Sequence, residues 1–192
     1  MKFLLKTMAL VAVLSLPLLF QSTLTEILKL RTFDYFVAEQ EQSNYFAVLN
    51  ITEEDIEREG GWPLPRARLA EIQDNLMQRG ALGVGWAVAF PQPDRLGGDE
   101  EFARSLQGSN SVLAMYENEG AGFPETVGTV IIGNPVGGYS ASGVVQNIEV
   151  LRNAASQGIA SAPVEADQLV RRMPLLMKTP DGWVPAFGTQ VL

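Results

Sequence analysis

The chain has 192 residues, of which 46% are apolar and 19% charged, a composition that suits one globular domain with a short appendage. Acidic residues outnumber basic ones by 22 to 14, and the resulting net charge of −8 disfavours binding to nucleic acid and to anionic lipid headgroups. The chain has no Cys and no His, which removes disulfides, cysteine nucleophiles, Ser-His-Asp catalysis and the commonest zinc ligand. We therefore expect no enzyme, no metal and no cofactor.

The amino terminus has the pattern of an export signal. Lys2 and Lys6 precede the apolar run 8–20, and no pair of small residues for cleavage closes that run. The sequence therefore predicts an uncleaved transmembrane helix over residues 1–24, with a cleaved signal peptide as the alternative. Because lysines stay on the cytoplasmic side, everything after Phe20 is expected outside, which places the chain at the inner membrane with its globular part in the periplasm or beyond.

Residues 25–44 are predicted to form a stalk helix, over 25–36, and a linker. The run 45–50 is short, apolar and aromatic, which is typical of a core strand. Thr52 and Asp55 then form a capping pattern for an acidic helix over 53–59, which Gly60-Gly61 would end.

Two prolines introduce the next helix. Pro63 keeps Trp62 extended, and Pro65 suits the first turn of a helix that runs to about Arg79. The following run 82–90 is almost wholly apolar, as in a strand covered by helices on both faces. Strand, helix and strand in this order predict that runs 45–50 and 82–90 form a parallel pair with a right-handed crossover.

The remaining elements are read in the same way. They are a helix over 99–106, strands over 111–116 and 126–132, a loop over 133–143, a helix over 147–156, and a hairpin of runs 169–178 and 183–187. The predicted fold is α/β: a mixed, mostly parallel sheet flanked by helices, filling residues 45–192 and preceded by the transmembrane helix.

Two blocks of sequence resemble a known family. Gly60-Gly-Trp-Pro-Leu-Pro-Arg66, the helix after it, and Gly83-Val-Gly-Trp-Ala-Val-Ala-Phe90 with Pro93-Asp94 are similar to the core of CHASE2 domains. Asp167-Gln-Leu-Val-Arg-Arg-Met-Pro-Leu-Leu176, followed by Gly182-Trp-Val-Pro-Ala-Phe187, is similar to the later part of the same domain. The match covers about residues 24–192 in the family's order.

The resemblance implies an extracytoplasmic sensory input domain of a membrane-bound receptor, truncated before its later membrane spans and its cytoplasmic output. In this family that output is commonly a nucleotide cyclase, a histidine kinase or a diguanylate cyclase. We also expect a homodimer, through the anchor and the stalk, and an unknown extracytoplasmic ligand. Thr52 and Ala87 stand where the family often has acidic residues, so a cation site there is not expected.

Trp62, Arg66 and Asp94 are the candidate ligand-binding residues, because they are predicted to converge near the carboxyl ends of two strands, where open α/β sheets bind ligands. The structural alternative is that Trp62 packs on the sheet while Arg66 pairs with Asp94 or with a helix end. For the whole chain the alternatives to a receptor input are a membrane-tethered periplasmic interaction module without an output domain and, more remotely, a hydrolase that uses only carboxylates.

Overall fold

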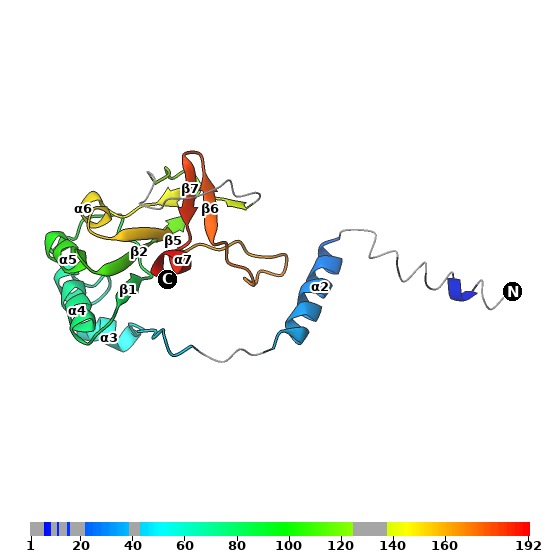
Figure 1. Ribbon diagram of the computed structural model, residues 1–192, viewed down its shortest axis with the longest axis horizontal. Coiled ribbons are helices and arrows are strands. Elements are labelled where there is room, and N and C mark those ends of the chain that lie inside the picture. The colour runs from blue at the N-terminus through cyan, green and yellow to red at the C-terminus, as the bar shows by residue number, and fades with distance from the viewer. Residues whose placement is uncertain (1–5, 9–10, 12–14, 16–21, 39–42, 125–137) are drawn as a thin grey trace. The chain divides into compact units, whose positions relative to one another are not determined.

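The computed structural model describes residues 6–8, 11, 15, 22–38, 43–124 and 138–192, which fall into two compact units (Figure 1). The N-terminal unit comprises Met1–Leu49 with Val164–Arg171, and the main unit comprises Asn50–Pro163 with Arg172–Leu192. The predicted transmembrane helix over residues 1–24 lies largely outside the described residues. In the described part, none of the helices has both the length and the hydropathy of a membrane span.

The N-terminal unit contains helix α2, Thr23–Phe36, which confirms the helix predicted over 25–36. A capping box opens it: the side chain of Ser22 accepts from the Thr25 backbone N–H at 3.3 Å, and the Ser22 N–H donates to Thr25 Oγ1 at 3.1 Å. The helix has no basic residue in its last turn, which contains Asp34 instead. Its carboxyl end therefore lacks a positive charge of its own to offset the helix dipole.

The core strand predicted over 45–50 is wrong. No strand forms there, and Tyr45 and Val48 are 93% and 86% exposed. Apolar and β-branched residues favour a strand only when a neighbouring strand accepts their backbone hydrogen bonds, and no described strand pairs with this run. The predicted parallel pair of runs 45–50 and 82–90 is wrong for the same reason.

The main unit begins with two helices that follow their sequence signals. Helix α3, Glu53–Arg58, has the predicted cap, in which Asp55 N–H donates to Thr52 Oγ1 at 3.3 Å, and it ends at Gly60 and Gly61, both at positive φ. Helix α4, Arg66–Gln78, starts directly after Pro65 and buries Leu69 and Ala70. A side-chain cap therefore starts α3, whereas α4 starts after Pro65 without a side-chain cap hydrogen bond, with Pro65 one position before the first turn in which it was predicted.

The larger sheet is centred on β2, Asn110–Glu117. Strands β1, Gly83–Trp86, and β5, Ser156–Ile159, flank β2 in parallel, and β4, Val144–Val145, pairs with its end in the antiparallel direction. Strand β1 is shorter than the predicted run 82–90. The helix predicted over 147–156 is corrected to the single turn α6, Glu149–Arg152, because the chain turns at Asn153 and then enters β5.

The smaller sheet comprises β3, Tyr139–Ser140, β6, Leu176–Thr179, and β7, Gly182–Pro185. Strands β6 and β7 form the predicted hairpin, with shorter strands than the runs 169–178 and 183–187, while β3 joins β6 in parallel. Both sheets are therefore mixed, and the α/β class is confirmed. The strand predicted over 126–132 and most of the loop 133–143 lie outside the described residues.

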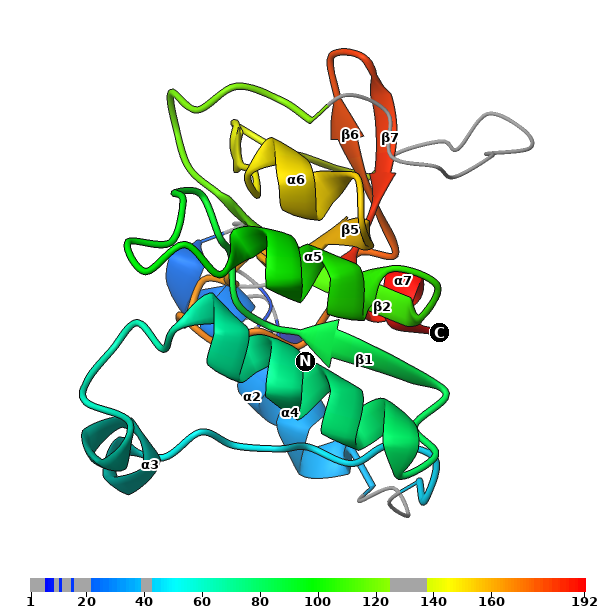
Figure 2. The same cartoon turned by 90° about the vertical axis from the view of Figure 1, so that its left-hand side faces the viewer.

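Helices cover both faces of the larger sheet. The Trp86 ring meets Phe102 of α5, Asp99–Leu106, edge to face, whereas a Cβ at Gly85 would lie 2.9 Å from Phe187 of α7, Phe187–Val191. Because neighbouring strand residues point to opposite faces, α5 and α7 lie on opposite sides. Figure 2 shows α4 and α5 side by side in front of β1 and β2, with α7 behind.

Candidate functional site

The structure joins two of the three predicted site residues. Arg66 begins α4 and Asp94 lies in the loop after β1, and the Arg66 backbone N–H donates to Asp94 Oδ2 at 2.9 Å. Trp62 is 53% exposed, and no hydrogen bond in the described part of the main unit connects it to either residue. Of the predicted trio, only Trp62 presents a large accessible surface.

The carboxylates of Asp94 and Asp99 organise the loop between them. Asp99 Oδ2 accepts from the Asp94 N–H at 2.7 Å, and Asp94 Oδ1 accepts from the Leu96 N–H at 3.2 Å. Burial raises the pKa of Asp94, but backbone hydrogen bonds from Arg66, Leu96 and Gly98 outweigh it and leave this pKa below its ordinary value. Asp94 therefore acts as a fixed anion that accepts backbone N–H groups.

The Arg66 guanidinium is packed inside the main unit. Its Cζ lies 4.3 Å from the centre of the Phe90 ring, and its Nε lies 3.4 Å from Asp99 Oδ1 without a hydrogen bond between these two atoms. Burial lowers the pKa of Arg66, against the opposing effect of Asp99 and Asp94. The structural alternative is confirmed for Arg66, which pairs with the start of helix α5, but not for Trp62, which remains exposed.

Two helix N-termini meet at this loop. A Cβ on Gly98, the residue before α5, would lie 2.5 Å from the Ala67 backbone nitrogen in α4, so only glycine allows this approach. The positive ends of the two helix dipoles are thus close together, and Asp94 and Asp99 supply the negative charge that offsets them. These polar groups therefore position α4 against α5.

A second polar site, in the N-terminal unit, was not predicted. Arg171 uses all five of its N–H donors on three carboxylates, which we call the Arg171 cluster: Arg171, Asp34, Glu165 and Asp167. The hydrogen bonds are Nε to Asp34 Oδ1 (2.6 Å), Nη2 to Asp34 Oδ2 (2.8 Å), Nη1 to Asp167 Oδ1 (2.8 Å), Nη2 to Asp167 Oδ2 (2.7 Å) and Nη1 to Glu165 Oε2 (3.1 Å).

Arg171 and Asp167 are the most shielded members of the Arg171 cluster, whereas the Asp34 side chain is 39% exposed. The side chains of Arg171 and Asp167 are 8% and 4% exposed, and Arg31 of α2 lies 3.5 Å from Asp167 Oδ2. The hydrogen bond from Arg171 lowers the pKa of Asp167 to about 2 and also lowers the pKa of Asp34. The carboxylates in turn raise the pKa of Arg171. Arg171, Asp34 and Asp167 therefore remain charged at neutral pH.

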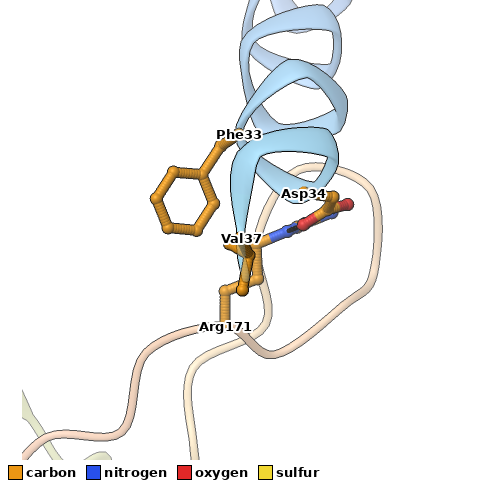
Figure 3. A pocket seen from close by; sticks show the side chains of 4 residues that line it. All are labelled: Phe33, Asp34, Val37 and Arg171. Carbon is orange, nitrogen blue, oxygen red and sulfur yellow. Dashed lines mark hydrogen bonds and ion pairs between the residues drawn. The ribbon is translucent and has the colours of Figure 1, made fainter. Parts of the chain in front are cut away.

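From the sequence, only the pairing of Asp167 with Arg171 within this cluster could have been predicted. Asp167 and Arg171 stand four residues apart in a segment that resembles the family, but Asp34 is 137 positions from Arg171 and nothing local connects them. Figure 3 shows the Arg171 side chain reaching Asp34 at the end of α2. These two residues, with Phe33 and Val37, line an open pocket of about 390 Å³. Within the described ranges, no group of three or more acidic side chains is arranged to hold a metal ion.

Comparison with known protein families identifies a match over almost the whole chain. A family model of the CHASE2 domain matches residues 8–192. No curated protein and no solved structure matches the chain significantly.

Proposed function

The chain belongs to the CHASE2 domain family, a family of extracellular sensor domains, and from that membership we propose that it is the sensory input domain of a membrane-bound signal-transduction receptor. The observation that carries the proposal is the extent of the match, from the apolar N-terminal segment to helix α7. Because the family is sensory and not catalytic, no reaction is assigned to this chain.

We further propose how the chain is placed at the membrane and which cytoplasmic domain it regulates. The N-terminal segment 1–24 anchors the chain in the inner membrane as a homodimer, with the globular part on the periplasmic side, and the full-length receptor has a cytoplasmic nucleotide cyclase, histidine kinase or diguanylate cyclase. The positions of Lys2 and Lys6 before the apolar run support this orientation. The membrane-tethered interaction module is the competing function.

A pair of reporter fusions tests the orientation. Alkaline phosphatase, which folds only after export, and green fluorescent protein, which is fluorescent only in the cytoplasm when exported by the general route, are each fused after Leu192. Phosphatase activity without fluorescence supports the proposal, and the reverse result overturns it. Replacing Lys2 and Lys6 by Glu is the matched control, which should reduce the phosphatase signal.

Reading the gene in frame beyond the codon for Leu192 tests the output. Apolar spans followed by a cyclase, kinase or diguanylate cyclase domain support the receptor. A stop codon directly after Leu192 favours the interaction module and overturns the proposed coupling.

The proposed ligand contact is through Trp62, with Arg66 and Asp94 holding the loop beneath it. A thermal-shift screen with small organic acids, amines and sugars tests this assignment. A compound that raises the melting temperature of the native chain but not of Trp62→Ala supports it, whereas one that stabilises both chains equally assigns the ligand to another surface. Trp183→Ala, in β7, controls for the loss of an indole.

A further inference from the structure

Helix α2 is poorly equipped to remain folded by itself. It has 14 residues, about the length at which an isolated helix is marginal in water, and its buried residues are only Thr25 and Leu30. Its last turn contains Asp34, a negative charge at the negative end of the helix dipole, and no basic residue. The stability of the last turn must therefore come from outside the helix.

Arg171 provides the positive charge that the last turn of α2 lacks. Its guanidinium donates two hydrogen bonds to the Asp34 carboxylate, Nε to Oδ1 at 2.6 Å and Nη2 to Oδ2 at 2.8 Å. A positive charge held there offsets both the Asp34 charge and the helix dipole. The remaining N–H donors of Arg171 are directed to Glu165 and Asp167, so the guanidinium is fixed by its own loop before it reaches α2.

From this geometry we infer that Arg171 is the positioning residue of the stalk: it keeps the last turn of α2 folded and holds α2 on the segment Val164–Arg171, and its release is the step that frees the stalk helix. The signalling meaning of that step rests on the proposed sensory function. The segment continues along the chain into Arg172 and then β6, so a movement of this segment reaches α2 through Arg171, which binds Asp34, and through Asp167, which lies 3.5 Å from Arg31.

Replacing Asp34 by Asn distinguishes a role of Arg171 from helix propensity. Asp34→Asn removes an unfavourable charge from a helix end, so on helix propensity and dipole alone it should protect the last turn better. If Arg171 holds the turn through a bidentate pair with the Asp34 carboxylate, the same substitution should weaken it. The two explanations therefore predict opposite changes in one observable.

Hydrogen–deuterium exchange on the full 192-residue chain measures that observable, through the amides of residues 33–37. We expect faster exchange in Arg171→Ala and in Asp34→Asn, and faster exchange in Arg171→Lys as well, because an ammonium keeps the charge but cannot make the parallel pair of hydrogen bonds. Glu26→Gln is the matched control on the same helix: its ion pair with Lys29 is exposed and 3.4 Å long, so residues 33–37 should exchange as in the native chain.

The opposite results overturn the inference. Slower exchange in Asp34→Asn would mean that helix propensity governs the last turn, and unchanged exchange in Arg171→Lys would reduce Arg171 to a simple charge. Tryptophan fluorescence, to which the buried Trp86 of the main unit contributes, shows whether the main unit of a variant has unfolded. If Arg171→Ala has unfolded, the result for Asp34→Asn decides. Because no output is measured, failure here is distinct from failure of the sensory proposal, which the reporter fusions and the gene decide.

Discussion

The indole Nε1–H of Trp86 donates to Oε1 of Gln73 at 2.9 Å, which connects the end of β1 to the middle of α4 inside the core. The Gln73 amide nitrogen donates in turn to Ser111 Oγ at 2.8 Å and to Ser109 Oγ at 3.3 Å. The buried Gln73 side chain thus satisfies polar groups of Trp86, Ser109 and Ser111. A buried polar group that loses its hydrogen-bond partner destabilises the folded state.

Replacing Gln73 by Leu should therefore destabilise the main unit, although leucine is more apolar. The substitution leaves the Trp86 N–H without its acceptor, and we expect a loss of about 1–3 kcal/mol in the free energy of unfolding. Urea unfolding followed by tryptophan fluorescence measures it. Gln78→Leu, at an exposed position of the same helix, should change stability by no more than about 0.5 kcal/mol. Equal effects of the two substitutions would contradict the role given to Gln73.

Two glycines of the larger sheet should differ in their tolerance of a methyl group. A Cβ at Gly158 would lie 2.6 Å from the Phe187 Cα, whereas at Gly85 the obstacles are side-chain atoms, Phe187 Cζ and Val191 Cγ2, each at 2.9 Å. A side chain can move more easily than a backbone, so Gly158→Ala should destabilise more than Gly85→Ala, with losses of about 1–3 kcal/mol for such overpacking. Thermal denaturation ranks them. Gly122→Ala, with open space around it, is the control, and the reverse ranking would refute the argument.

The buried pair of Arg66 and Asp99 lends itself to a double-mutant cycle. Arg66→Met leaves the Asp99 carboxylate without its cation and should cost about 3 kcal/mol. Asp99→Asn retains an acceptor for the Asp94 N–H while it removes the charge. The double variant should be less destabilised than the sum of the single ones, by about 0.5–3 kcal/mol. Additive effects in urea unfolding would show that the two side chains do not interact, and exposed Arg58→Met serves as the reference.

Acid should open the Arg171 cluster only well below neutral pH. The Asp167 carboxyl has its pKa lowered from 3.8 to about 2 by Arg171, with Arg31 adding to the effect. A lowered pKa in the folded state means that the stabilisation is complete above 3.8 and is lost as the pH falls through about 2. Near-neutral shifts in pH should therefore leave the cluster closed, with Asp34 and Glu165 also bound to Arg171.

An NMR titration of the Asp167 side-chain carboxyl carbon measures this pKa. At about pH 3, Asp167 should still be ionised in the native chain, and in Arg171→Ala its midpoint should move towards the ordinary value. A native midpoint near that ordinary value would show that the hydrogen bonds of Arg171 do not hold Asp167 in solution.

The sequence predicted the elements whose causes are local. The cap at Thr52, the proline before α4 and the glycine stop at Gly60-Gly61 depend on neighbouring residues, so α3 and α4 begin and end close to where expected. Strand β5 was missed because its sequence, Ser-Gln-Gly-Ile, has no strand pattern. It is a strand because β2 pairs with it, and Gly158 is required there by the close approach of Phe187.

The candidate sites also differ in whether their contacts are close in sequence or only in space. Arg66 and Asp94 were expected to meet because each was placed after a strand, but the strand expected before Arg66 does not form. The structure joins them at the start of α4 instead, through a backbone hydrogen bond. Asp34 could not be assigned to Arg171, since a pair separated by 137 positions is visible only in three dimensions. The exposure of Trp62 likewise depends on packing that composition does not specify.

The exposed run Tyr45–Leu49 has a practical consequence for anyone who handles this protein. It is aromatic and β-branched, contains no proline or charge, and lies open to solvent, which is the profile of a segment that self-associates into cross-β stacks. Glu39 and Glu41 precede it and Glu53 and Glu54 follow it, so repulsion between carboxylates acts as the gatekeeper. Concentrated stocks should therefore be kept at low salt, because salt screens the repulsion between those glutamates.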